Sequence, residues 1–191
     1  MNKFLIGLAS QSPRRQYLLA EAGFRFELIP NAYDEVVPEG MDPVDVPEWL
    51  AHQKAVHALP LIEHRDLILT ADCIVIMEGE IIGKPTDPSE AHELLERLSG
   101  RTHQVVSGVC LMTPNKSLSF SAQSLVTFGQ LTAKEIGYYV RSFDPLDKAG
   151  AYGIQDWIGW NKIVRIEGSY SNIMGLPMYE VYHQLQSFVN Q

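Results

Sequence analysis

Strand-like and helix-like segments alternate along this chain of 191 residues, and that order limits its possible folds more than any other feature. Short apolar runs predict strands over residues 5–9, 24–29, 66–77, 81–82, 103–112, 119–128 and 162–166. Helices are expected over residues 13–22, 46–58 and 179–189, with two more that begin after Asp87 and Thr132. Such alternation is typical of an α/β protein, and hairpins mixed with helical crossovers predict a mixed sheet. The segment 144–160, rich in glycine and aromatic residues, is expected to be an ordered loop region.

Length and composition narrow the class of protein. The length suits a single domain over residues 1–191. Asp and Glu number 23 against 15 Lys and Arg, a net charge of -8, which argues against binding extended nucleic acid through a basic face. Cys73 and Cys110 lack the spacing of a disulfide framework or zinc site, so we expect a protein of the reducing cytoplasm. The longest apolar run, near residues 67–77, is too short to cross a membrane.

The first candidate site is the turn that leads from the first strand into the first helix. It contains Ser10, Ser12, Arg14 and Arg15, with Ser12 as the expected N-cap and Pro13 in the first turn. Free backbone N–H groups at a helix start, together with hydroxyls and guanidinium groups, attract phosphate. A capped helix with two solvated arginines explains the same pattern equally well. The chain has neither the GxxxxGKS/T nor the GxGxxG motif.

A lone carboxylate interrupts the apolar strand predicted over residues 66–77. By strand alternation, Asp72 shares a face with Ile74 and Ile76. A buried carboxylate needs an ion partner, hydrogen bonds or a metal. Either Asp72 has such a partner and a functional role, or the strand emerges into solvent at this point.

Two lysines and a further acidic pair are candidates to act with Asp72. Lys54 belongs to an i, i+4 row beside the buried stripe of its helix, so it could pair with Asp72 or extend along the surface. Lys84 follows Gly83, which permits close approach of a ligand. Asp34 and Glu35 offer carboxylates for a metal, although a solvated loop explains them equally well. The six histidines have no ligand spacing, and no GxSxG motif occurs.

Eight short motifs occur in an order that resembles one protein family. They are Ser10-Gln11-Ser12-Pro13-Arg14-Arg15, Asp34-Glu35, Lys54, Ala71-Asp72, Gly83-Lys84-Pro85, Leu98-Ser99-Gly100-Arg101-Thr102-His103, Asp147-Lys148-Ala149-Gly150-Ala151-Tyr152-Gly153-Ile154-Gln155, and Gly168-Ser169-Tyr170 with Gly175-Leu176-Pro177. They extend over nearly the whole chain. The chain therefore resembles the Maf family of nucleoside triphosphate pyrophosphatases, which is also associated with septum formation.

The resemblance implies an activity and a fold. The activity is metal-dependent hydrolysis between the α- and β-phosphates of a nucleotide, which gives a monophosphate and pyrophosphate. The implied cofactor is a divalent cation, Mg²⁺ or Mn²⁺. The implied fold is a mixed, curved sheet flanked by helices, with two lobes around a cleft, as in inosine triphosphatase-like enzymes. A homodimer is also implied.

The resemblance further assigns roles to individual residues. Asp72 matches the residue proposed in the family to act as general base. Arg14, Cys73 and Gln155 match positions associated with selecting the nucleobase of the substrate. The Ser-Pro-Arg-Arg and Lys-Ala-Gly-Ala-Tyr-Gly-Ile-Gln motifs resemble the subgroup that acts on dTTP and UTP. That subgroup usually has Thr where this chain has Cys73, and a thiol is the weaker hydrogen-bonding group.

These roles combine into one mechanistic hypothesis. Ser10, Ser12, Arg14 and Arg15 would bind the substrate with Lys54 and Lys84, and those cationic groups would offset the charge of the leaving pyrophosphate. Glu35 and Asp72 would bind the metal, and Asp72 would deprotonate the attacking water. Two alternatives stay open. One is a sister pyrophosphatase that prefers a nucleotide with another base, such as 7-methyl-GTP or another modified nucleotide. The other is a regulator of septum formation that binds nucleotide without turnover.

Overall fold

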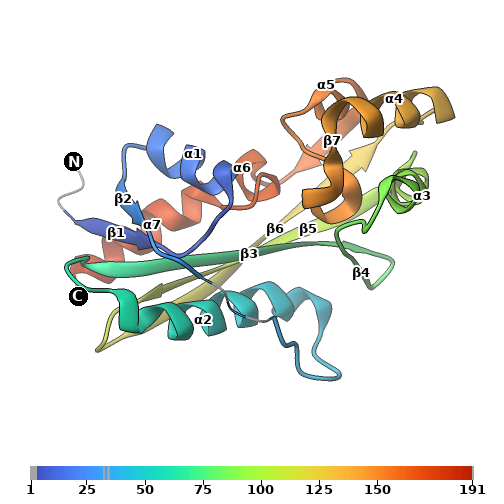
Figure 1. Cartoon of the computed structure of the whole chain (residues 1–191). Helices are drawn as coiled ribbons and strands as arrows, with labels where there is room; N and C mark the ends of the chain where they lie inside the picture. Colours follow the sequence, from blue (N-terminus) through green and yellow to red (C-terminus); the bar gives the residue numbers. More distant parts are fainter. Residues whose placement is uncertain (1–3, 32, 34, 191) are drawn as a thin grey trace. The chain divides into compact units, whose positions relative to one another are not determined.

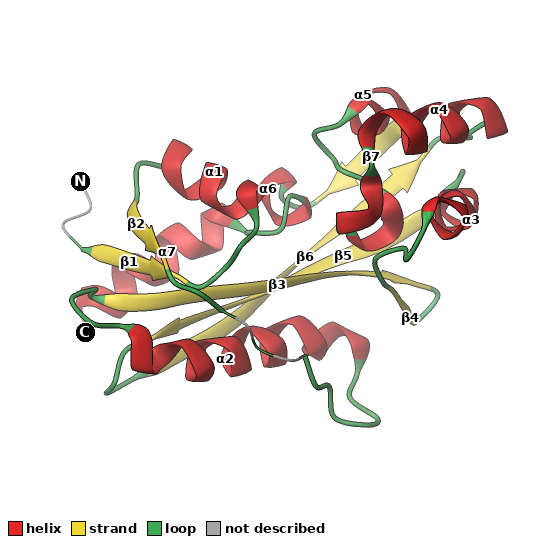
Figure 2. Ribbon diagram, viewed as in Figure 1, coloured by secondary structure: helices red, strands yellow, loops and turns green. Residues whose placement is uncertain are grey.

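The computed structural model describes residues 4–31, 33 and 35–190, whose helices and strands are shown in Figures 1 and 2. The strands are β1 (Leu5–Leu8), β2 (Arg25–Leu28), β3 (Leu67–Met77), β4 (Glu80–Ile82), β5 (Thr102–Met112), β6 (Ser117–Phe128) and β7 (Ile163–Glu167). The α-helices are α1 (Pro13–Glu21), α2 (Val46–Ala58), α3 (Pro88–Leu98), α4 (Ala133–Phe143), α5 (Trp157–Lys162), α6 (Tyr170–Ile173) and α7 (Met178–Asn190). Short 3-10 helices are η1 (Pro43–Asp45), η2 (Leu59–Leu61), η3 (Pro145–Asp147) and η4 (Ala149–Ala151).

The sheet is mixed, as the alternation of strands and helices predicted. Its strand order is β2-β1-β3-β5-β6-β7, and β4 pairs with β3 off this path. Strand β1 runs parallel to both β2 and β3, whereas β4 is antiparallel to β3 and β7 is antiparallel to β6. Helices flank this sheet (Figure 2). The expected α/β fold class is therefore confirmed.

The chain forms two compact units, each made of several segments. The first contains residues 1–73, 107–122 and 175–191, and the second contains residues 74–106 and 123–174. Strands β3, β5 and β6 each contribute a segment to both units. The expectation of a single domain over the whole chain stays a prediction.

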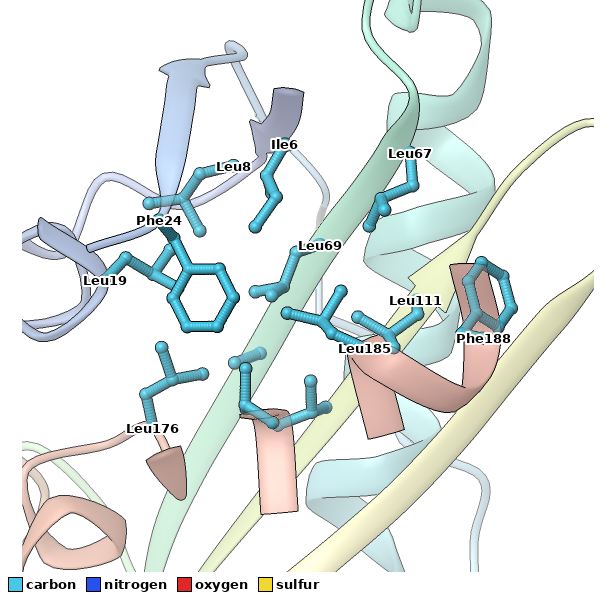
Figure 3. Packing of buried hydrophobic residues seen from close by; sticks show 13 residues of the cluster. Ile6, Leu8, Leu19, Phe24, Leu67, Leu69, Leu111, Leu176, Leu185 and Phe188 are labelled. Atoms are coloured by element: carbon cyan, nitrogen blue, oxygen red, sulfur yellow. The ribbon is translucent and has the colours of Figure 1, made fainter. Parts of the chain in front are cut away.

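In the first unit, apolar side chains pack on both faces of β3. Leu67 and Leu69 join a cluster with α1 and α7, several of whose members are seen in Figure 3. Ile68 lies in a separate cluster that also contains alanines of α2. Helix α2 lies on one side of β3, with α1 and α7 on the other (Figure 1). Alternate residues of β3 therefore face different helices, and the even-numbered ones face α2.

A glycine lets α2 approach the sheet closely. A Cβ atom at Gly108 of β5 would lie 2.1 Å from the carbonyl carbon of Pro47 and 2.2 Å from the nitrogen of Glu48. No side chain larger than hydrogen fits there without moving the helix backbone. Gly108 therefore fixes the first turn of α2 against the sheet.

In the second unit, polar contacts hold the turn that precedes α5. The Tyr139 hydroxyl donates to Asp156 Oδ2 at 2.7 Å and accepts from the Gly153 amide at 3.0 Å. Tyr152 and His103 form a buried hydrogen bond of 2.7 Å. Burial lowers the pKa of His103 to about 4, so its ring is neutral near pH 7.

The helix signals were mostly accurate. The expected capping box is present at the start of α4, where Thr132 and Glu135 bond reciprocally. Ser12 occupies the N-cap of α1 with Pro13 behind it, but its side chain makes no capping hydrogen bond in the described part of the chain. At α3, Asp87 accepts from the amides of Ser89 and Glu90.

The prediction of a loop over residues 144–160 was wrong at its end, since α5 begins at Trp157. The short helix α6 was also not predicted. Gly159 lies in the middle of α5, where its low helix propensity indicated a loop. The structure gives the reason for this glycine: a Cβ there would lie 1.9 Å from the Ile154 carbonyl oxygen. That contact depends on how the turn before α5 folds back on the helix, which the sequence pattern does not reveal.

Candidate active site

Asp72 lies near the middle of β3, in the position where sequence reasoning found an unexpected carboxylate. It is only 8% exposed. Its Oδ1 atom accepts a hydrogen bond of 2.6 Å from Lys54 Nζ. The strand does not emerge into solvent here, and the expected partner of Asp72 is Lys54.

Lys54 reaches Asp72 from α2, which packs on the same face of the sheet. Val46, Leu50 and Ala58 of its i, i+4 row are buried, and the Lys54 side chain is 13% exposed. Lys54 Nζ also donates to Glu35 Oε1 at 2.7 Å. The ammonium group therefore joins a buried carboxylate and a half-exposed one, which is a compensated arrangement for a buried charge.

Glu35 and Asp72 together form a donor set that suits a hard divalent cation. The Lys54 contacts use one oxygen of each carboxylate, and each group has a second oxygen. Mg²⁺ is commonly held by one or two carboxylates together with substrate phosphates. Within the described residues, no group of three or more His, Cys, Asp or Glu side chains is arranged to hold a metal by itself. Asp34 lies outside the described residues.

The turn before α1 is organised by Arg15. Its Nη1 atom donates to Ser10 Oγ at 3.0 Å, and its Nε atom donates to the Gly175 carbonyl oxygen at 2.9 Å. Ser10 Oγ also accepts from the Ser12 amide at 3.3 Å. Burial lowers the pKa of Arg15, and the nearby charge of Asp72 raises it in turn. Arg15 therefore connects the serine turn to the Gly175 segment.

Arg14 and Ser12 lie in the same turn. Both are partly buried, and Ser12 leads directly into the first turn of α1. The structure thus brings the serine turn, Asp72, Lys54 and Glu35 into one compact unit. The substrate-binding roles of Ser10, Ser12, Arg14 and Arg15 stay predictions.

Cys73 follows Asp72 and lies beside different groups. A Cβ atom at Gly175 would lie 3.8 Å from Cys73 Cβ. Burial raises the pKa of the Cys73 thiol, while a hydrogen bond with Ser107 lowers it by a smaller amount. The thiol is consequently protonated near pH 7, which suits a pocket wall better than a nucleophile.

Lys84 and Gln155 belong to the second unit. Lys84 is exposed in the segment between β4 and α3. Gln155 lies in the turn held by Tyr139, and its carbonyl oxygen accepts from Trp160 Nε1 at 2.8 Å. Its side-chain Oε1 atom is buried and has no hydrogen-bond partner among the described residues. Their expected catalytic and specificity roles stay predictions.

Sequence reasoning missed the residues that support this site. Thr70 and Gly108 hold α2 against the sheet, and Ser107 bonds Cys73. Only Thr70 had a readable signal, because it lies two residues before Asp72 on the same face of a predicted strand.

The structure defines a mixed α/β protein in which an ammonium group joins two carboxylates, in the same compact unit as a serine- and arginine-containing helix start. The family model described as "Maf-like protein" matches residues 5–188. The chain therefore belongs to the Maf family, and the resemblance seen in its motifs is confirmed.

Curated relatives match over nearly their full length. A dTTP/UTP pyrophosphatase of Porphyromonas gingivalis is 46% identical over 98% of this chain and 96% of its own. A dTTP/UTP pyrophosphatase of Phocaeicola vulgatus is 43% identical over 97% of both chains. Among solved structures, the Ham1 protein of Staphylococcus aureus has a TM-score of 0.49 and 15% identity, over 97% of this chain and 98% of its own.

The sequence predicts no apolar segment long enough to cross a membrane. Among residues 4–31, 33 and 35–190, none of the helices is both long enough and apolar enough to span a bilayer.

Proposed function

We propose that this chain is a nucleoside triphosphate pyrophosphatase that hydrolyses dTTP and UTP. The observation that carries the proposal is the contact of Lys54 with both Asp72 and Glu35, in a chain of the Maf family. The relatives from Porphyromonas gingivalis and Phocaeicola vulgatus are named as dTTP/UTP pyrophosphatases, which supports the choice of substrates.

The reaction adds water across the anhydride bond between the α- and β-phosphates. The products are the nucleoside monophosphate and pyrophosphate. Asp72 accepts a proton from the attacking water, a task suited to a carboxylate held in one orientation. Lys54 holds that carboxylate in place through its 2.6 Å contact.

The triphosphate needs compensation for its charge. Arg14 and the amide groups of the turn at Ser10–Ser12 supply donors at a helix start, where anions bind favourably. Lys84, in the Gly83-Lys84-Pro85 motif of the family resemblance, is proposed as a further ammonium group for the triphosphate. Positive charge placed where the pyrophosphate leaves lowers the barrier of phosphoryl chemistry.

A divalent cation, Mg²⁺ or Mn²⁺, would be held by Glu35 and Asp72. Both are oxygen donors, as these ions prefer. The chemistry that a bound cation supplies is neutralisation of charge on the phosphate oxygens. Glu35 is partly open to solvent, which leaves room for water and substrate ligands.

The choice of base is assigned to Gln155, Arg14 and Cys73. Gln155 Oε1 is buried without a partner among the described residues, and a buried acceptor gains from a donor. The imide N–H of uracil or thymine is such a donor. Cys73 acts through the shape of its surroundings, since its thiol is already bonded to Ser107.

The proposal includes a cytoplasmic homodimer, and it has two competitors. A sister pyrophosphatase would prefer another base, such as 7-methylguanine, and a regulator of septum formation would bind nucleotide without turnover. Pyrophosphate release should be measured over dTTP, UTP, CTP, GTP and 7-methyl-GTP, with Mg²⁺, with Mn²⁺ and with chelator. We expect turnover of dTTP and UTP only with metal. Preference for another nucleotide would favour the sister enzyme, and binding without turnover would favour the regulator.

A further inference from the structure

One buried hydrogen bond ties helix α2 to strand β3 next to the Lys54–Asp72 contact. The Thr70 hydroxyl donates to the carbonyl oxygen of Ala51 at 2.6 Å. Thr70 is fully buried, with 0% of its surface exposed. It is therefore a polar group placed under an otherwise apolar helix face.

This hydrogen bond and the Lys54–Asp72 contact are neighbours on both elements. Thr70 and Asp72 are two residues apart on β3 and so face the same side of the sheet. Ala51 and Lys54 are three residues apart on α2, which puts them on adjacent turns of one face. The same strip of β3 therefore contacts the same strip of α2 twice.

The Ala51 carbonyl group does not need the Thr70 hydroxyl as its hydrogen-bond donor. In an α-helix, the carbonyl of Ala51 already accepts the amide N–H of the residue four positions further on. A valine of the same shape could fill the space of Thr70 without a buried hydroxyl to compensate. Apolar packing alone would not fix the position of α2 along β3, whereas a directional hydrogen bond from the hydroxyl does.

Val46 and Leu50 are buried in the first part of α2, whereas the helix packs through small side chains from Ala51 onward. Ala51, Ala55 and Ala58 are all fully buried against Ile68 and its neighbours. Such small side chains form shallow ridges, which resist sliding weakly. Gly108 fixes only the first turn of the helix, beside Pro47. The hydrogen bond from Thr70 joins α2 to β3 at Ala51, three residues before Lys54.

We propose that Thr70 is a positioning residue for the reaction: through Ala51 it holds α2 in the register that brings Lys54 to Asp72 and Glu35. The inference rests on the proposed pyrophosphatase function. Removal of the hydroxyl lets α2 move along β3 and loosens the contact of Lys54 with Asp72. A displacement of about 1 Å at a catalytic group can lower turnover up to a hundred-fold.

The test compares three variants of the full chain with matched shape or matched burial. Thr70→Val removes the hydroxyl, and Thr70→Ser keeps it. Ile68→Val removes a methyl group two positions earlier on β3, on the face that packs against the same helix. We expect Thr70→Val to lower kcat about ten-fold or more with less than about three-fold change in KM. Thr70→Ser should restore kcat to near the wild-type value, and Ile68→Val should leave it nearly unchanged.

A double-mutant cycle separates positioning from general destabilisation. In a Lys54→Met background, Thr70→Val should lower kcat no further, because the group it positions is gone. Melting temperatures of all variants show whether each one folds. Equal losses in Thr70→Val and Ile68→Val, or additive losses in the cycle, would overturn the proposal.

Crystal structures give a readout that does not depend on turnover. The distance from Lys54 Nζ to Asp72 Oδ1 should lengthen in Thr70→Val and stay near 2.6 Å in Ile68→Val. An unchanged distance in Thr70→Val contradicts the positioning role. Absence of turnover in the wild-type chain contradicts the proposed function instead, so the two failures are distinguishable. If Thr70→Val does not fold, Thr70→Ala takes its place.

Discussion

At the scale of single residues, the site depends on one ammonium group that compensates two carboxylates. Lys54 contacts Asp72 Oδ1 and Glu35 Oε1 at 2.6 and 2.7 Å. Asp72 is the more buried of the two acids, so it depends more strongly on Lys54. A buried charge left without its partner is unfavourable by several kcal/mol, less where solvent still reaches the group.

Lys54→Met should therefore reduce both stability and turnover. We expect a loss of about 1–3 kcal/mol in the free energy of unfolding, because the buried Asp72 side chain loses its ion partner. Turnover should fall at least about a hundred-fold, since the general base loses the group that orients it. Urea denaturation and pyrophosphate release measure the two effects. Lys134→Met, on the exposed side of α4, is the matched control, and an equal loss in both variants would refute the role of Lys54.

The partner of Asp72 could be predicted because its signal is local. A carboxylate on the apolar face of a strand and a lysine beside the buried stripe of a helix are both visible in short windows. The contact of Arg15 with Gly175 could not be predicted, because the two residues lie 160 positions apart along the chain. Two nitrogen atoms of Arg15 bond protein oxygens, and its expected substrate-binding role stays a prediction.

At the scale of elements, helix starts were the most predictable feature. The capping box of Thr132 and Glu135 and the Asp87 cap are fixed by neighbouring residues. Helix α5 was missed because Gly159 has a low helix propensity, and the close approach of the Ile154 carbonyl that requires a glycine there is not visible in the sequence. The position of α2 along β3 is likewise set by Thr70 and Gly108, and hence by contacts between distant segments.

The capping box also gives a prediction about pH. Hydrogen bonds from Lys162, and then from the Thr132 amide and hydroxyl, lower the pKa of Glu135 to about 2 from its ordinary 4.5. The ionised form is therefore favoured by folding, and its stabilising effect is complete above pH 4.5 and lost as the pH falls towards 2. Glu135→Gln should be less stable than wild type at pH 7, with a difference that shrinks below pH 4.5.

Urea denaturation at pH 7, 4 and 3 measures this difference. Glu93→Gln, an exposed change on α3, is the matched control and should alter stability little at any of these pH values. A difference for Glu135→Gln that stays constant from pH 7 to pH 3 would contradict the assigned role of the Glu135 carboxylate, which bonds both Lys162 and Thr132.

At the scale of the whole molecule, the net charge of -8 describes the surface and not the site. Arg14, Arg15 and Lys54 all belong to the first compact unit, where they accompany Asp72. A protein with an acidic surface can therefore bind one nucleotide while it repels extended nucleic acid. The mixed sheet could be predicted from the order of strands and helices, but the segments that make up each of the two units could not. Each unit combines segments far apart in sequence.

In the proposed reaction, Asp72 drives hydrolysis of the bond between the α- and β-phosphates. The most direct measurement is the identity of the products of dTTP, separated by ion-exchange chromatography, for wild type and Asp72→Asn. We predict dTMP and pyrophosphate in equal amounts from wild type, and a rate lower by about a hundred-fold or more from a folded Asp72→Asn variant. Release of dTDP and phosphate, or turnover retained in Asp72→Asn, would contradict the account.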